Sequence, residues 1–227
     1  MTGRITLGLG IITALYVLAL WWVDSRNQVF DGFVLLSSAL PLMLLAAFLS
    51  FVVRFARWRW LLLRAGNRLP VMRGLLVYLA GLAFTATPGK VGELVRIRYC
   101  ALWSIPPWKV IAAYVFERAL DLLVVLALAS LVIKRQDLLI SVACFALFAV
   151  GLVVLLALYP NGLEWCIRTL TSWRATRLAR LLQTLRDGLV GCRIWFHPLD
   201  LLVGAALGLA AWLITSLAFV YLVRHLG

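Results

Sequence analysis

The sequence predicts an all-α, polytopic membrane protein with about five transmembrane helices, one re-entrant hairpin and a cytoplasmic interfacial helix. Apolar residues make up 64% of the 227 residues, and the mean hydropathy is +1.01. A soluble domain of this length could not bury that much apolar surface. A second observation is that apolar runs of membrane-spanning length alternate with short basic segments. A third is one shorter apolar run that ends in a Pro-Gly turn.

Five apolar runs of 19 to 25 residues can each span a bilayer core of about 30 Å at 1.5 Å per residue. They cover residues 5–23, 33–53, 110–133, 138–159 and 199–223. The first run follows a single Arg4 and lacks a convincing small-residue cleavage site. We therefore expect it to be an uncleaved anchor rather than a signal peptide.

Residues 74–87 form a run of 14 uncharged residues that stops at Pro88-Gly89-Lys90. A membrane crossing takes about 20 apolar residues, so this run is too short to be an ordinary span. Backbone that enters lipid without crossing must satisfy its polar groups against protein or a water-filled cavity. The run therefore predicts a re-entrant hairpin that enters and leaves on the same face of the membrane.

The distribution of Lys and Arg supports this topology. Six lie in residues 54–73, four in 88–109 and six in 160–198, and with Arg4 these make 17 of the 22 in the chain. Basic residues concentrate in cytoplasmic loops. A full crossing by residues 74–87 would place the basic segment 160–198 outside, against this rule. We therefore expect a cytoplasmic N-terminus, five spans and a C-terminus on the opposite side.

Residues 163–189 place leucine and isoleucine side chains near one helical stripe, with arginines on its polar sides. This pattern predicts an amphipathic interfacial helix that follows a Pro160-Asn161-Gly162 turn. A membrane-surface linker held by anionic lipid explains it, and a specific ligand site is the alternative.

The turn after the short apolar run has the composition of an anion-binding helix start. Pro88 suits the first turn of a helix, and Gly89 and Gly92 allow a close approach by a neighbour or a ligand. The free N–H groups of such a start can receive a phosphate, and Lys90 would strengthen it. The spacing is not that of a nucleotide-binding P-loop. A purely structural turn remains the alternative.

Three charged residues follow this turn. Glu93 and Arg96 are three positions apart on the next helix and can pair, and Arg98 lies further along. Beside a re-entrant hairpin they would line a head-group path, with arginine recognising phosphate through its planar fork. The alternative is a structural ion pair.

Glu117, Arg118 and Asp121 lie inside the predicted span 110–133. An ionisable residue in a span costs about 2.5–3.5 kcal/mol on insertion scales, so three of them require compensation. Glu117 and Asp121 share one helical face, and Arg118 can reach Asp121. The group is either an internal salt bridge or a functional one. In the second case it would partner the basic residues of 88–98, or relay a proton or a substrate.

Residues 54–60 mix arginine and tryptophan directly after the second predicted span. Anchoring at the membrane interface explains this composition. The alternative is that Arg57 or Arg59 gathers anionic head-groups beneath the hairpin.

Several function classes have no support in the sequence. No nucleophile–base pair, paired catalytic carboxylates or metal-ligand cluster can be assembled, so we expect no enzyme activity, no metal and no cofactor. The four cysteines form no CxxC pair and predict no disulfide framework. The net charge is +13, and most of the basic residues lie in the segments between apolar runs. Membrane topology and attraction to anionic lipid explain this excess of positive charge better than nucleic-acid binding does.

Three features occur in an order that resembles a known family. They are Arg57-Trp58-Arg59, the turn Pro88-Gly89-Lys90-Val91-Gly92-Glu93-Leu94-Val95-Arg96, and Glu117-Arg118-Ala119-Leu120-Asp121. The chain thereby resembles the transmembrane region of the lysylphosphatidylglycerol synthase family. These flippase-like proteins include the multiple peptide resistance factors, and their pattern is a P-G-x-x-G-E-x-x-R turn followed by E-R-x-x-D in the next helix.

The resemblance implies a protein of the bacterial inner membrane that moves or presents amphiphiles such as aminoacylated phospholipids, hopanoids or lipid-linked sugars. It also implies that the residues of the two motifs form the conduit. No aminoacyl-transferase domain follows, so synthase activity is not expected. Family members are longer and carry a second Pro-Gly-containing hairpin. The chain would then lack a C-terminal second hairpin, and either be a fragment or act as a homo-oligomer of two copies.

The sequence therefore predicts translocation or binding of an anionic, aminoacylated or lipid-linked amphiphile. The partner would be a membrane phospholipid or a lipid-linked substrate. A non-transporting accessory subunit of a lipid-modification or glycan-assembly system is the alternative, and an enzyme acting on lipid-linked sugar is a weaker third. The predicted substrate-binding residues are Pro88, Gly89, Lys90, Gly92, Glu93, Arg96, Arg98, Glu117, Arg118 and Asp121.

Overall fold

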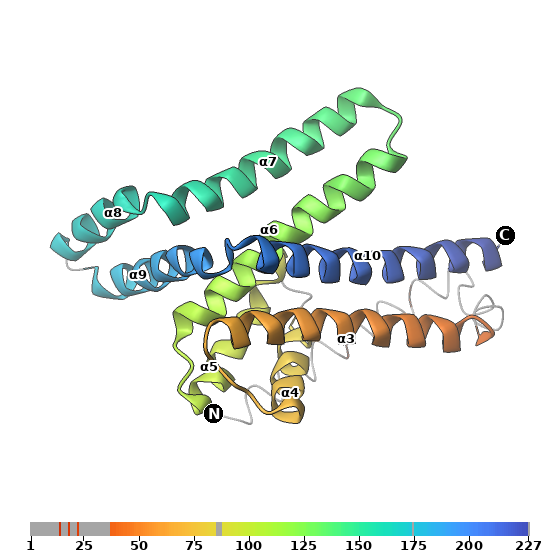
Figure 1. Ribbon diagram of the computed structural model, residues 1–227, viewed down its shortest axis with the longest axis horizontal. Helices are drawn as coiled ribbons and strands as arrows, with labels where there is room; N and C mark the ends of the chain where they lie inside the picture. Colours follow the sequence, from red (N-terminus) through yellow and green to blue (C-terminus); the bar gives the residue numbers. More distant parts are fainter. Residues whose placement is uncertain are drawn as a thin grey trace. The chain divides into compact units, whose positions relative to one another are not determined.

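The computed structural model describes residues 37–84, 88–173 and 175–226, together with Ala14, Leu18 and Trp22. These residues are almost entirely helical, and no strand occurs among them (Figure 1). The all-α fold class is therefore confirmed. The chain divides into two units: residues 1–48 with 216–227, and residues 49–215.

Three helices of the described part are long and apolar enough to cross a membrane: α3 (Leu40–Arg64), α7 (Gln136–Leu158) and α10 (Pro198–Leu226). Helix α6 (Pro107–Val132) has 26 residues and a comparable length, but it carries charged side chains in its middle. These lengths identify a multi-pass membrane protein. The predicted span 5–23 lies outside the described residues except for Ala14, Leu18 and Trp22, so a total of five spans stays a prediction.

Helix α3 extends beyond the predicted second span. We expected the span to stop at Val53, before the arginine-rich residues 54–60, but the helix continues to Arg64. Arg57 and Trp58 are buried inside it, each 1% exposed. Arg57 and Trp58 therefore pack inside the protein, and the position of the membrane interface along α3 stays a prediction. The helix can continue because carboxylates from α6 compensate the charge of Arg57.

The predicted hairpin contains a short apolar helix, α4 (Val71–Leu82), as its first arm. Its 12 residues cover only about 18 Å, too little to cross the bilayer core. Residues 85–87 lie outside the described part, and the chain then returns through the 3-10 helix η2 (Pro88–Val95) and α5 (Arg96–Cys100). Both return elements pack against α4. Entry into and exit from one membrane face stay a prediction.

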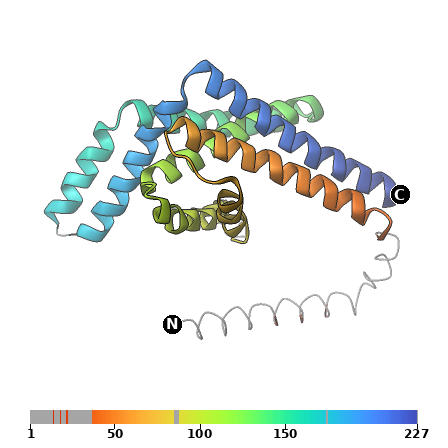
Figure 2. The same cartoon turned by 60° about the horizontal axis from the view of Figure 1, so that its bottom comes forward.

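The segment 163–189 forms two helices where we expected one. Helix α8 (Asn161–Ser172) and helix α9 (Thr176–Gly191) are joined at residues 173–175 and pack against each other as a hairpin (Figure 2). The predicted turn at Asn161-Gly162 is instead the first turn of α8. The pattern of apolar residues could not reveal this break, because α8 and α9 each have an apolar face of their own.

Helix α9 packs closely on the N-terminal part of α6. A Cβ atom added at Gly188 would lie 2.5 Å from Ile111 Cγ2, and one at Gly191 would lie 2.8 Å from the Trp108 ring. After α9, the short 3-10 helix η4 (Cys192–Trp195) places the Trp195 indole in the core, where its Nε1–H donates to Leu61 O at 3.0 Å. The segment between α7 and α10 is thus packed against the helices that carry the charged residues.

Asp200 joins the C-terminal end of α3 to the first turn of α10. Its carboxylate is fully buried and accepts hydrogen bonds from Arg64 Nε at 2.8 Å and Arg64 Nη2 at 3.0 Å. The Trp60 indole donates to it as well, at 3.2 Å. A carboxylate at a helix start also interacts favourably with the free N–H groups there. In the other unit, Ser38 Oγ and His225 Nε2 lie 2.7 Å apart.

Candidate functional site: a buried ion cluster

Arg57 binds two carboxylates in the interior of the larger unit. Its Nε–H donates to Glu117 Oε1 at 3.2 Å, and its Nη1–H donates to Asp121 Oδ1 at 2.8 Å. Arg57 and Glu117 are each 1% exposed and Asp121 is 5% exposed. A buried charge is tolerated only when it is paired and hydrogen-bonded. These three side chains form the centre of what we call the ion cluster.

The helices place these groups with little freedom. Glu117 and Asp121 are four residues apart on α6, which puts both carboxylates on the face that meets α3. Helix α10 contributes Gly208 beside the Arg57–Asp121 pair, where an added Cβ would lie 2.6 Å from Arg57 Nη1 and 3.7 Å from Asp121 Oδ1. Glycine at this position leaves the space that the guanidinium fills.

Two less buried arginines complete the ion cluster. Arg118 Nη2 lies 3.1 Å from Asp121 Oδ2, and Arg54 Nη1 lies 3.9 Å from the same oxygen. Their side chains are 24% and 17% exposed. Three guanidinium groups against two carboxylates give the ion cluster a net charge of +1. It therefore favours an anion at its edge, where Arg54 and Arg118 are accessible.

A second buried ion pair lies beside the ion cluster. Arg96 Nη2 is 3.0 Å from Glu93 Oε2, and both side chains are almost fully buried. The guanidinium carbon of Arg96 lies 4.0 Å from the centre of the Tyr78 ring and 5.7 Å from the Trp58 ring. Such cation–π contacts stabilise a desolvated arginine. The predicted Glu93–Arg96 pair is thus present in the structure.

Helix α4 supplies the surface on which this second pair rests. A Cβ atom added at Gly81 would lie 2.2 Å from Arg96 Nε and 2.8 Å from Arg96 Cγ, so only glycine leaves room for the arginine. Tyr78, one helical turn earlier, is within electrostatic reach of Arg96 and Glu93 on one side and of Arg57 and Glu117 on the other. Tyr78 therefore connects the two predicted motifs.

Several buried polar atoms in this region have no hydrogen-bond partner among the described residues. On the donor side they include Nε of Arg59, Arg96 and Arg118. On the acceptor side they are Glu117 Oε2 and Asp121 Oδ2, although the latter lies 3.1 Å from Arg118 Nη2 in an ion pair. Buried polar atoms are ordinarily satisfied, so unpartnered ones call for an explanation. The spare guanidinium N–H groups match the acceptor oxygens of a phosphate or carboxylate.

The structure brings together part of the predicted substrate-binding set. Glu93, Arg96, Glu117 and Asp121 are buried within one region, and Arg118 lies at its edge. Gly92 is half-buried on η2. Arg98 is exposed on α5 and is not part of the buried set. The side chains of Pro88, Gly89 and Lys90 lie outside the described part, although Pro88 does begin a helix, of the 3-10 type.

The partner of the carboxylates differs from the one expected from the sequence. We considered the basic residues of 88–98 as partners of Glu117 and Asp121, but among the described contacts the guanidinium groups come from α3 and from α6 itself. Sequence reasoning named Arg57 as an interfacial residue or a collector of head-groups, and missed that it pairs with both carboxylates. The signal was present, because two carboxylates and one arginine inside a span leave one negative charge to be compensated.

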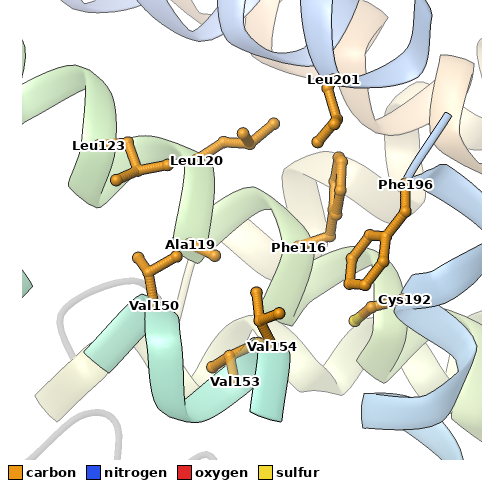
Figure 3. Close-up of a pocket in the computed structure, with 10 residues that line it drawn as sticks. All are labelled: Phe116, Ala119, Leu120, Leu123, Val150, Val153, Val154, Cys192, Phe196 and Leu201. Atoms are coloured by element: carbon orange, nitrogen blue, oxygen red, sulfur yellow. The ribbon is translucent and has the colours of Figure 1, made fainter. Parts of the chain in front are cut away.

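An apolar pocket of about 370 Å³ lies between α6 and α7 (Figure 3). Phe116 and Leu120 of α6 face Val150 and Val154 of α7 across it, and Phe196 and Leu201 close its end. A neighbouring groove of about 390 Å³ continues between α6 and α10. Both cavities have almost entirely aliphatic and aromatic walls, which suit a hydrocarbon chain.

Comparisons with known proteins place the chain in a family. Searches of curated proteins and of solved structures found no similar protein or structure. The sequence model of the family described as lysylphosphatidylglycerol synthase TM region matches residues 4–227, essentially the whole chain. The motifs around Arg96 and Asp121 lie within the match, and the chain therefore belongs to the lysylphosphatidylglycerol synthase transmembrane-region family, a group of flippase-like membrane proteins.

Proposed function

We propose that this protein binds the anionic head-group of a membrane amphiphile at the ion cluster and moves it across the bilayer. The observation that carries the proposal is the charged region inside apolar helices: Arg57, Glu93, Arg96 and Glu117 are at most 3% exposed. Ionisable groups at membrane depth are costly, and they usually mark a substrate or ion pathway.

The charge and the free donors favour a phosphate-containing head-group. The ion cluster carries a net positive charge, and Arg118 keeps a buried Nε–H without a partner among the described residues. Guanidinium groups recognise phosphate through parallel N–H donors. Arg54 and Arg118, the two partly exposed members, would meet the head-group first. These two arginines would then exchange part of their contact with Asp121 for contact with the incoming anion.

The apolar cavities beside α6 support a lipid rather than a free anion as the substrate. Phe116 and Leu120, which line the pocket, lie on the same helix as Glu117 and Asp121. One molecule could then place its head-group at the ion cluster and an acyl or polyprenyl chain in the pocket between α6 and α7. Aminoacylated phospholipids and lipid-linked sugars both have this build. The structure favours no particular one among them.

The proposed location is the bacterial inner membrane with the N-terminus in the cytoplasm, as the charge distribution predicts. The basic segments 59–73 and 160–198 would then face anionic lipid on the cytoplasmic side. They would raise the local concentration of the substrate near the ion cluster. A homo-oligomer remains part of the proposal, because a single copy supplies one such site in the described residues.

The test is head-group exposure in proteoliposomes. Purified protein is reconstituted with fluorescent anionic or aminoacylated phospholipids, and the fraction of probe accessible to an external quencher is followed over time. We expect the wild type to accelerate crossing, and Arg118→Gln and Glu93→Gln to abolish the acceleration. Arg135→Gln is the control, because Arg135 forms only an exposed pair with Asp137 at the start of α7.

The result separates the proposal from its main alternative. An inactive wild type with every lipid tested would overturn transport by this chain alone. If Arg118→Gln and Glu93→Gln then disrupted the association with a lipid-modifying or glycan-assembly enzyme, the accessory-subunit function would replace it. Slow crossing that all variants share would indicate only bilayer disturbance and would also contradict the proposal.

A further inference from the structure

A row of polar side chains follows the contact between α3 and α10, two helices long and apolar enough to cross a membrane. The helices run antiparallel, because Arg64 meets Asp200 at one end of the row and Ser50 meets Thr215 at the other (Figure 2). Positions 50 and 64 are 14 residues apart, about 21 Å along a helix. The row, which we call the polar seam, therefore extends over about two thirds of a bilayer core.

The first two levels of the polar seam hold charged groups. At one end Arg64 donates two hydrogen bonds to the buried carboxylate of Asp200. The next level is the guanidinium of Arg57, which fills the space left by Gly208 of α10. In the predicted topology the Arg64 end faces the cytoplasm, so Arg57 lies deeper in the membrane.

The next two levels continue the polar seam past the ion cluster. The guanidinium carbon of Arg54 lies 5.1 Å from the centre of the Trp212 ring, and the Trp212 Nε1 donor is buried without a hydrogen-bond partner among the described residues. At the last level Ser50 Oγ donates to Ala211 O at 3.1 Å and lies 3.1 Å from Thr215 Oγ1. Arg54 Nε also donates to Ser50 Oγ, at 3.4 Å, so these two levels are connected.

The polar seam has a buried floor and an accessible edge. Arg57 and Asp200 are buried, whereas Arg64 and Arg54 are partly exposed and Thr215 is exposed. Hydrogen bonds between helices stabilise a membrane protein only weakly, and ionisable residues in a span are costly. Stability alone therefore gives a poor account of polar groups at four successive levels. An anion that followed the edge would find a donor at each of them.

We propose that the polar seam is the path along which the lipid head-group crosses the membrane. The proposal rests on the proposed function, because it extends the anion site of the ion cluster into a route. Arg54 and Arg57 belong to both, so the ion cluster is one stage of the path. Beyond it, the hydroxyl groups of Ser50 and Thr215 replace the water that the head-group has lost. Helices α3 and α10 must then part at this level to let the head-group pass.

A reversible tether between the two helices tests this path. Ser50→Cys and Thr215→Cys are combined in a chain whose Cys144 and Cys166 are replaced by alanine. Because the two hydroxyl oxygens lie 3.1 Å apart, the sulfur atoms that replace them can form a disulfide of about 2 Å. We expect oxidation to stop the accelerated crossing of fluorescent phosphatidylglycerol in proteoliposomes, and a reductant to restore it. A purely structural contact would tolerate the tether.

The controls for the tether are the two single-cysteine variants, treated with the same oxidant. Mass spectrometry measures the fraction of protein that carries the disulfide. Each single variant should keep its transport rate after oxidation, because it cannot join α3 to α10. A loss of transport that the single variants share would contradict the proposal, since it would not depend on holding the helices together.

A second measurement probes the polar seam without any transport. In the same background, the reaction of Thr215→Cys with a negatively charged methanethiosulfonate is compared with that of Leu213→Cys. Leu213 is exposed on α10 and is not part of the polar seam. We expect Thr215→Cys to react at least about tenfold faster, because a thiol in apolar surroundings stays protonated and unreactive. Free glycerol phosphate, which offers the same phosphate as the lipid head-group, should slow the reaction at Thr215→Cys alone.

The outcomes separate this inference from the proposed function. Unchanged crossing by fully tethered protein, or equal reaction rates of Thr215→Cys and Leu213→Cys, would overturn the polar seam as the path, although transport by the wild type would stand. If the wild type accelerates the crossing of no lipid, the proposed function fails. The reaction rates at the two cysteines then still decide whether the polar seam admits an anion.

Discussion

At the scale of single residues, Arg57 holds the charged interior together. It provides the closest contact of both buried carboxylates, and its own side chain is 1% exposed. Breaking a buried ion pair leaves an uncompensated charge, which destabilises a protein by about 3–5 kcal/mol. We expect Arg57→Gln to lower the free energy of unfolding by about this amount, as measured by denaturant titration in detergent.

A double-mutant cycle checks the cause of that loss. Arg57→Gln combined with Glu117→Gln should recover part of the stability, because the second change removes the charge that the first leaves unpaired. Arg135→Gln removes an exposed arginine and should change stability little. Equal effects of Arg57→Gln and Arg135→Gln would contradict the assignment of Arg57 as the central ion-pair partner.

The cysteines offer a second prediction at this scale. Burial raises the pKa of the Cys192 thiol to about 12, because the charged thiolate is disfavoured away from water. Since the thiolate is the reactive form, Cys192 should react with a maleimide about 1000-fold more slowly at neutral pH than an ordinary thiol. Mass spectrometry should find Cys166, half-buried on α8, labelled before Cys192. The rate at which Cys192 reacts with the maleimide should rise about tenfold per pH unit. Labelling of Cys166 and Cys192 at similar rates would show that Cys192 is not buried.

At the scale of elements, the packing of α9 on α6 depends on glycine. Gly188 is followed three residues later by Gly191, and both face α6 at distances too short for a Cβ atom. Gly188→Ala raises the helix propensity by about 1 kcal/mol. The added methyl group would nevertheless meet Ile111 Cγ2 at 2.5 Å and Ile111 Cβ at 2.9 Å. Overpacking of this kind costs about 1–3 kcal/mol, so we expect a net destabilisation.

Gly162→Ala is the matched control for this prediction. Gly162 lies in the first turn of α8, and an added Cβ would meet nothing within 4 Å. The change should leave the thermal midpoint equal or slightly higher, since alanine restricts the unfolded chain. If Gly188→Ala were as well tolerated as Gly162→Ala, α9 would not pack on α6 as the structure has it.

The same elements mark how far the sequence alone could predict the fold. The apolar runs 138–159 and 199–223 became α7 and α10 with ends shifted by one to three residues, because an unbroken apolar run has few competing structures. The end of α3 was missed because the composition of residues 54–60 is equally typical of an interface. The break between α8 and α9 was missed because neither Gly nor Pro marks residues 173–175.

At the scale of the whole molecule, the motifs predicted the residues of the site but not their contacts. Two ion pairs join residues three apart in the sequence and follow from helix geometry: Arg118 with Asp121 on α6, and Glu93 of η2 with Arg96 at the start of α5. Arg57 lies 60 residues from Glu117 in the sequence, and helix periodicity contains no information about such a contact. The contacts of Tyr78 and Gly81 with Arg96 could not be predicted for the same reason. A uniformly apolar run does not indicate which face of the helix packs against a charged side chain.

The topology is the prediction that concerns the entire chain. Arg54, Arg57 and Arg96, which we counted as loop charges, belong instead to the buried region. The remaining basic residues still concentrate in 59–73, 88–109 and 160–198, while the connection between α6 and α7 holds only Lys134 and Arg135. The predicted orientation of the chain in the membrane is therefore the same when these three arginines are left out of the count. Because α4 is too short to cross, the segments on either side of it should lie on one face of the membrane.

Single cysteines at exposed positions test this arrangement. In a chain with Cys144 and Cys166 replaced by alanine, Arg68→Cys before α4, Leu102→Cys after α5 and Trp173→Cys between α8 and α9 should react with an impermeant maleimide from the cytoplasmic side. Lys134→Cys should react only from the opposite side. Labelling of positions 68 and 102 from opposite faces would mean that the segment crosses the membrane. The basic segment 160–198 would then lie outside, and the ion cluster would open toward the wrong surface to collect head-groups from the cytoplasmic leaflet.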